Sequence, residues 1–202
     1  MIIKVKEKYI CVIVPQKSGI STVTSILAYP HVNQIYNKTI TRNLLEKDDL
    51  LFLLGGSIYE NINFIKSNNI QIEHYIGIYR DPIERFISAY KDRVLKKNKD
   101  NFKDKSLNFV LSNLPYLIQK KTDFGNHARP QFFWLGEKKY YNKIISTHEL
   151  NTIFKPIIEN ISDTKIPDIK QNTSIQGINV NLSDQQILFL KNFYSNDYNF
   201  IK

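Results

Sequence analysis

Two groups of side chains in this 202-residue sequence have the chemistry of a binding site for phosphate or a similar anion. The first is Lys17, which is followed at once by a glycine and several hydroxyl residues, in the run Ser-Gly-Ile-Ser-Thr over 18–22. The second is Arg80, with Ser88 eight positions later. Lysine and arginine supply positive charge and hydroxyls supply hydrogen bonds, so each group suits an anionic ligand.

The elements that must position Lys17 follow from the hydrophobic pattern. Residues 9–14 are a continuous apolar run rich in β-branched residues, which predicts a strand buried on both faces. Apolar residues then recur at helical spacing from Val23 to Leu27, and we expect this helix to stop before Pro30. Because the first N–H groups of a helix lack intrahelical partners and carry the positive end of the dipole, the loop before it is expected to bind an anion.

A second junction between a strand and a helix holds Arg80. Residues 75–79 are apolar and predict a buried strand, Asp81 suits an N-cap, and Pro82 suits the first helical position. The stripe expected to be buried on this helix consists of Ile83, Phe86, Ile87, Tyr90 and Val94. Ser88 lies off that stripe, so Arg80 and Ser88 can both face the crevice above the sheet where open α/β folds bind ligands.

Both groups resemble motifs of a known family. Residues 80–90 look like the 3′-phosphate-binding motif of sulfotransferases that use 3′-phosphoadenosine 5′-phosphosulfate (PAPS), especially the carbohydrate sulfotransferases. Residues 17–22 are similar to the 5′-phosphosulfate loop of that family, Pro-Lys-x-Gly followed by hydroxyl residues, although Gln16 separates the proline from the lysine. The resemblance implies that PAPS is bound by Lys17, Ser18, Gly19, Ile20, Ser21, Thr22, Arg80 and Ser88.

Three further segments resemble this family. A histidine followed by Pro-Gln is found at His127, Pro130 and Gln131, and a Glu-Leu pair at 149–150 opens a predicted helix. A Tyr-x-x-Asp sequence, 194–197, lies near the carboxyl end. The aromatic residues 132–134, which follow the Pro-Gln pair, are expected to belong to the core.

The resemblance implies a fold and a reaction. The fold is α/β and three-layered, with a mostly parallel central sheet flanked by helices as in P-loop kinases, and we expect one domain over residues 1–202. The reaction is in-line transfer of a sulfuryl group from PAPS to a hydroxyl, most simply of a carbohydrate, which leaves 3′-phosphoadenosine 5′-phosphate (PAP). Lys17 is expected to stabilise the charge that grows on the leaving phosphate.

A sugar hydroxyl needs a general base, and related enzymes use a histidine or a glutamate. The candidates are Glu60 and His127. His127 is a candidate because it lies in the histidine-Pro-Gln segment and a histidine side chain is suited to proton transfer at neutral pH. We favour Glu60, because the helix that follows the Gly-Gly pair at 55–56 could face the Lys17 loop.

Composition sets the broader limits. Hydrophobic residues make up 42% of the chain and the net charge is +9, which favours a packed globule with an anionic ligand or partner. Cys11 is the only cysteine and the four histidines lack ligand spacing, so we expect neither disulfide nor metal. No signal-peptide pattern or membrane-spanning apolar run is present, and we expect a soluble cytoplasmic protein.

Other functions stay open. A P-loop nucleotide kinase is disfavoured because Lys17 precedes the glycine, unlike in a Walker A sequence. A sulfotransferase-like domain that only holds an anion stays open, because Gln16 separates the proline from the lysine and Ile20 occupies a position where the family often has a hydroxyl residue. A nucleic-acid-binding module is disfavoured because no element collects the positive charge into a stripe with interleaved aromatics. The sequence does not identify the acceptor, because the loops at 33–49 and 97–105, where acceptor specificity is expected to lie, carry no recognisable motif.

The remaining pattern predicts further elements. A short helix is expected within 33–49, a strand or buried turn at 50–54, and a strand at 140–146. Helices are predicted from Ser57 to 68–69, over 107–118 with a break at Pro115, and from the capping box at 183–186.

Overall fold

The structure is a computed structural model that describes residues 1–32, 56–169 and 178–201. The chain divides into two compact units, each built from two separate stretches. Unit 1 is Met1–Tyr79 with Trp134–Asn172, and unit 2 is Arg80–Phe133 with Thr173–Lys202. Because the two units interleave along the chain, this division does not test the prediction of one domain over 1–202, which stays a prediction.

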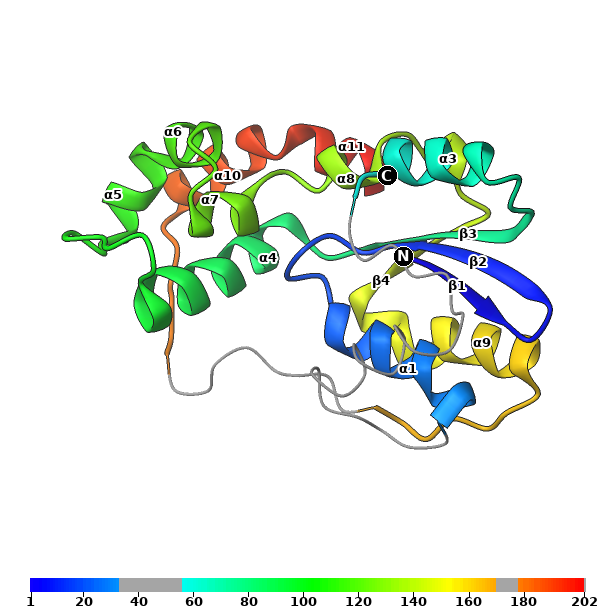
Figure 1. The fold of residues 1–202 in the computed structure, drawn as a ribbon. Helices are drawn as coiled ribbons and strands as arrows, with labels where there is room; N and C mark the ends of the chain where they lie inside the picture. The colour runs from blue at the N-terminus through cyan, green and yellow to red at the C-terminus, as the bar shows by residue number, and fades with distance from the viewer. Residues whose placement is uncertain (33–55, 170–177, 202) are drawn as a thin grey trace. The chain divides into compact units, whose positions relative to one another are not determined.

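A four-stranded sheet forms the centre of the described part of unit 1 (Figure 1). Its strands lie in the order β1 (Ile2–Val5), β2 (Lys8–Ile13), β3 (Ile72–Tyr79) and β4 (Lys143–Ser146). The β1–β2 pair is antiparallel and the other two pairs are parallel, which confirms the mostly parallel sheet. The strands predicted at 9–14 and 75–79 are confirmed as β2 and β3, and the strand predicted at 140–146 is shorter.

Strand β1 is not predicted from the sequence, because charged residues alternate with apolar ones over these first positions. Ile2, Ile3 and Val5 are nevertheless buried, and Ile3 pairs with Ile10 of β2. The charged residues at 4, 6 and 7 break up the apolar pattern, so the strand is recognised only once its partner is known.

Helices cover both faces of this sheet. Helices α1 (Ile20–Val32) and α9 (Lys155–Ser162) lie on one face, and α3 (Ile58–Ser67) lies on the other (Figure 1). Alternate residues of β2 divide between the faces, with Ile10 and Val12 packed against the α1 side. Helix α1 continues through Pro30, contrary to the expected stop, because a proline in the last turn removes only one intrahelical hydrogen bond.

The regular elements of unit 2, in the residues that the structure describes, are all helices. It contains α4 (Pro82–Ala89), the π-helix η1 (Tyr90–Lys97), α5 (Leu107–Ser112), α6 (Leu114–Gln119), α7 (Asp123–Ala128), α10 (Asp184–Phe193) and α11 (Ser195–Ile201). At α8 (Phe132–Leu135) the chain returns to unit 1, which also holds η2 (Lys138–Tyr140), η3 (Thr147–Glu149) and η4 (Leu150–Phe154). Phe86, Leu114, Phe124, Leu190 and Tyr194 form the centre of the unit 2 core.

Several local predictions are confirmed. The helix predicted from Ser57 is α3, which also has a capping box of Ser57 and Glu60, and α10 begins with the predicted capping box of Ser183 and Gln186. Pro115 lies at the start of α6, so it separates α5 from α6. The elements predicted within 33–49 and at 50–54 lie outside the described residues.

Two predictions about buried side chains need correction. Of the stripe predicted on α4 and its continuation, Phe86, Tyr90 and Val94 are buried as expected, whereas Ile83 and Ile87 are only half-buried. Ser88, which was predicted to lie off the stripe, is buried, and so is Arg85, which enters the core with polar partners. Phe133 is 54% exposed and Phe132 is also exposed, so these aromatics do not form core; Phe133 instead packs under the Arg129 guanidinium, 4.3 Å from ring centroid to Cζ.

Candidate functional site

The Lys17 loop joins β2 to α1 in a tight turn of unit 1. The Ser18 N–H donates to the carbonyl of Pro15 at 3.1 Å. Both Lys17 (φ 65°) and Gly19 (φ 79°) adopt left-handed backbone conformations. For a residue with a side chain this conformation costs roughly 1–2 kcal/mol, so the fold holds Lys17 in a strained backbone conformation.

Gly19 is required by its surroundings as well as by its backbone. A Cβ atom at this position would lie 3.0 Å from Cδ1 of Leu150, the first residue of η4. The segment that carries Leu150 is fixed by a capping box, in which the Ser146 N–H donates to the Glu149 carboxylate at 2.9 Å. In the Glu-Leu pair predicted to open a helix, Glu149 therefore fixes the segment and Leu150 packs against Gly19 of the Lys17 loop.

The start of α1 is suited to an anion. The Gly19 carbonyl accepts the first helical hydrogen bond, from the Val23 N–H at 3.0 Å, so the N–H groups of Ile20, Ser21 and Thr22 have no partner within the helix. No acidic residue lies in this first turn, and α1 has 13 residues over which its dipole accumulates. The donors, the lysine and the close-fitting glycine together fit a phosphate or phosphosulfate group.

The Arg80 motif lies at the start of unit 2, and its helix α4 begins as predicted. The Asp81 carboxylate caps α4 by accepting from the N–H groups of Ile83 (3.0 Å) and Glu84 (2.9 Å), and Pro82 is the first helical residue. Arg80 Nε donates to Glu84 Oε2 at 3.3 Å. Ser88 lies two turns into the helix and is buried.

The backbone of Arg80 is held by the side chain of Gln131. The Arg80 N–H donates to Gln131 Oε1 at 3.0 Å, and Gln131 Nε2 donates to the Arg80 carbonyl at 2.7 Å. Gln131 is in turn held by Asp197 of α11, which accepts from the backbone N–H groups of Gln131 (2.8 Å) and Phe132 (2.7 Å). A continuous chain of hydrogen bonds thus runs from α11 to the peptide groups of Arg80.

Arg85, five residues into the same motif, is fully buried beside this chain. Its Nη2 donates to the Arg129 carbonyl, and its guanidinium also bonds the Tyr194 hydroxyl, which donates to the Ala128 carbonyl at 2.6 Å. Burial lowers the pKa of Arg85, while Tyr194 and Asp197 oppose that change. Burial likewise raises the pKa of Asp197, against the effect of its two N–H donors and Arg85.

The two candidate bases lie in different units. His127 is half-buried on α7, and its Nδ1 donates to the Asp123 carbonyl at 2.7 Å, which orients the ring. Glu60 is exposed on α3, and its carboxylate accepts from the Ser57 N–H at 2.5 Å in the capping box. Helix α3 covers the sheet face opposite α1, the helix that follows Lys17 (Figure 1).

The structure groups the predicted binding residues in two places. Residues 17–22 form one loop of unit 1, whereas Arg80 and Ser88 lie on or next to α4 of unit 2. The roles of Gln131 and Asp197 were missed, although both belong to segments that resemble the family. Arg85 gave no signal beyond its place in the motif, because an arginine on a helix is ordinarily solvated.

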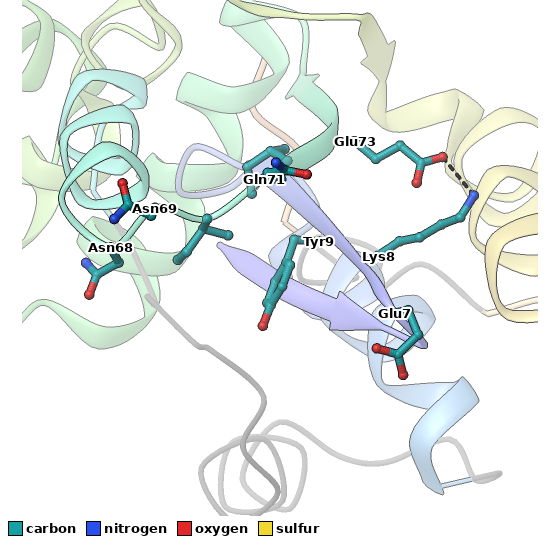
Figure 2. A pocket seen from close by; sticks show the side chains of 9 residues that line it. Glu7, Lys8, Tyr9, Asn68, Asn69, Gln71 and Glu73 are labelled. Atoms are coloured by element: carbon teal, nitrogen blue, oxygen red, sulfur yellow. Dashed lines mark hydrogen bonds and ion pairs between the residues drawn. The ribbon is translucent and has the colours of Figure 1, made fainter.

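An open pocket of about 750 Å³ lies elsewhere on unit 1. It is lined by residues 7–9 and 68–73, at the amino ends of β2 and β3, where Lys8 is paired with Glu73 at 2.9 Å (Figure 2). The Lys17 loop follows the carboxyl end of β2. This pocket is therefore not part of the predicted PAPS site.

Two kinds of feature are absent from the residues that the structure describes. Within 1–32, 56–169 and 178–201, no three His, Cys, Asp or Glu side chains gather as a metal site would require. In the same ranges no helix is long and apolar enough to cross a membrane.

Comparison with known proteins adds one positive finding. No curated protein and no solved structure matches the chain. Residues 2–201, almost the whole chain, match the family described as "Sulfotransferase family". With the Lys17 loop before α1 and the Arg80 motif opening α4, this match shows that the chain belongs to the sulfotransferase family.

Proposed function

We propose that this protein transfers a sulfuryl group from PAPS to a hydroxyl of a carbohydrate acceptor. The observation that carries the proposal is the Lys17 loop, in which a strained lysine and a close-packed glycine precede a helix whose first turn holds no acidic residue. Such a loop is suited to the phosphosulfate end of the donor. The arginine and serine of the Arg80 motif are suited to its 3′-phosphate, which separates PAPS from AMP and ATP.

Each residue has a distinct task in this proposal. Lys17 and the N–H groups of residues 20–22 would hold the 5′-phosphosulfate, with the hydroxyls of Ser18, Ser21 and Thr22 as further donors. Arg80 would hold the 3′-phosphate by charge-assisted hydrogen bonds and Ser88 by its hydroxyl. PAPS, when bound, supplies an activated sulfuryl group. The Lys17 ammonium would stabilise the negative charge that develops on the 5′-phosphate oxygen.

The acceptor hydroxyl must lose a proton, and His127 and Glu60 remain the candidates. His127 is supported by its orientation, because donation from Nδ1 to the Asp123 carbonyl leaves Nε2 as the basic nitrogen of the neutral ring. Glu60 is already engaged in a helix cap. We therefore propose His127 as the base and Glu60 as a capping residue.

A thermal-shift comparison of PAP, AMP and ATP tests the donor site. At a hundred times its dissociation constant, a ligand that binds only the folded state adds about 2.7 kcal/mol of stability. For a chain of this length that corresponds to roughly 5–10 °C. We expect such a shift from PAP and a much smaller one from AMP or ATP at equal concentration; equal shifts for PAP and AMP would contradict the proposal.

Sulfuryl transfer is then measured with radiolabelled PAPS and a panel of neutral and acidic oligosaccharides. We expect labelled product with at least one acceptor. Selective binding of PAP without transfer to any acceptor, or hydrolysis of PAPS alone, would instead favour an anion-binding domain without sulfotransferase activity.

A further inference from the structure

We propose that Gln131 and Asp197 are positioning residues for Arg80, and that they determine how tightly the protein binds the 3′-phosphate of its donor. This inference rests on the proposed function, because it assigns a further task at the same site. It concerns two residues that would not touch the donor.

The first argument is the place of Arg80 in the chain. Strand β3 ends at Tyr79 and α4 begins at Pro82, so the Arg80 peptide groups belong to neither the sheet nor the helix. Unpaired backbone N–H and C=O groups are costly when they are removed from water. The Gln131 carboxamide forms hydrogen bonds with both groups of Arg80, at 3.0 and 2.7 Å. It thus replaces the backbone hydrogen bonds that a neighbouring strand would provide within a sheet.

The second argument is the chemistry of the side chain. An amide offers a donor and an acceptor side by side, which is the complement of a backbone N–H and C=O. Glutamate keeps only acceptors and methionine keeps neither, although both have nearly the same size. Among side chains that reach as far, glutamine therefore matches this pair of groups best.

The third argument is the support beneath Gln131. Both oxygens of Asp197 accept backbone N–H groups of the 131–132 turn, and Gln131 and Asp197 are each only 1% exposed. Burying a carboxylate is unfavourable unless it is well bonded. The site is thus a buried, satisfied hydrogen-bond chain that ends on the backbone of the proposed phosphate-binding arginine, and such chains limit the positions that their members can adopt.

Isothermal titration of PAP and AMP to the Gln131→Met variant tests the proposal. A guanidinium that is displaced by a fraction of an ångström loses hydrogen bonds to the 3′-phosphate only, so we expect PAP to bind 10- to 100-fold more weakly and AMP within twofold of wild type. The KM for PAPS should rise while kcat stays within about threefold. Gln119→Met, at an exposed position of α6, is the matched control and should change neither ligand.

Two further variants separate positioning from general destabilisation. Gln131→Glu keeps the size of the side chain and the acceptor for the Arg80 N–H but loses the donor to the Arg80 carbonyl. It remains informative if Gln131→Met does not fold, and we expect an intermediate loss of PAP affinity. In the Arg80→Ala background, Gln131→Met should have no further effect on PAP, because the two act through one group. Equal weakening of PAP and AMP, or additive losses in the double variant, would overturn the proposal.

Hydrogen exchange at the Arg80 amide distinguishes failure of this inference from failure of the proposed function. If wild-type protein does not prefer PAP to AMP, the proposed function fails. The Arg80 amide should still be protected in wild type and exchange at least tenfold faster in Gln131→Met, since Gln131 Oε1 is its acceptor. Unchanged protection in a folded Gln131→Met variant would remove the positioning role itself.

Discussion

The guanidinium of Arg80 is paired with the carboxylate of Glu84 one turn along α4, with Arg80 Nε 3.3 Å from Glu84 Oε2. Arg80 is therefore held at its backbone by Gln131 and at its side chain by Glu84. The two contacts have opposite consequences for an anionic ligand. Gln131 is neutral and only fixes position, whereas Glu84 places a negative charge next to the proposed 3′-phosphate site.

We expect Glu84→Gln to bind PAP more tightly than wild type. A unit negative charge about 4 Å from a second one in a well-solvated site costs about 1 kcal/mol, which corresponds to a gain of about fivefold. The gain should shrink as salt is raised from 20 to 500 mM, since screening removes the repulsion. Calorimetric titration of PAP at both ionic strengths measures it. Weaker binding by the variant would show that Glu84 chiefly orients Arg80.

Substitution of Lys17 is expected to remove activity without lowering the stability of the fold. Lys17→Gly removes the ammonium and also relieves the left-handed conformation at φ 65°. We expect sulfuryl transfer to fall by a hundredfold or more, as is usual when one electrostatic donor to a developing oxyanion is removed. The melting temperature should not fall. Turnover and thermal denaturation are measured together, with Lys143→Gly at an exposed position of β4 as the control for activity.

The spacing of apolar, capping and proline residues predicts strands and helix starts, because these depend on interactions between residues that are close in the sequence. The apolar run that became β2, the Asp81 cap and the Pro82 helix start each depend on a few neighbouring residues, and all three are confirmed. The burial of Arg85 and the clamp of Gln131 on Arg80 depend on residues 44 and 51 positions away. The spacing of residues along the chain does not show which distant side chains form hydrogen bonds with one another. The polar contacts that support the site could therefore be found only in the structure.

Cys11 is expected to report on the unfolding of unit 1. The thiol is fully buried on β2, and burial raises its pKa to about 11. The native protein should therefore not react with Ellman's reagent at pH 8 within an hour, and should release one thiol in 6 M guanidinium chloride. Rapid labelling of the native protein would contradict the buried position.

The same thiol gives a pH dependence with a definite sign. Between its ordinary pKa of 9.0 and the folded value of about 11, the unfolded chain loses the proton while the folded chain keeps it, so stability falls as pH rises. The loss is at most about 3 kcal/mol for a shift of two units. Urea denaturation of wild type and Cys11→Ala at pH 8.5, 9.5 and 10.5 checks this, because only the wild type should show the added slope.

The identity of the general base can be tested with two variants matched to their surroundings. Glu60→Gln keeps the capping box, since glutamine serves there as well as glutamate, but removes the basic carboxylate. His127→Asn removes the imidazole, and an amide NH₂ at this position can still donate a hydrogen bond.

We expect His127→Asn to lower kcat by roughly a hundred- to ten-thousandfold, the usual contribution of a positioned base, while PAP still binds. Glu60→Gln should retain at least half of the wild-type kcat and the wild-type melting temperature. The reverse pattern, with a large loss in Glu60→Gln at unchanged stability, would assign the base to Glu60, the residue that the sequence alone favours. Single-turnover measurements with saturating PAPS decide between them, because product release then does not mask the chemical step.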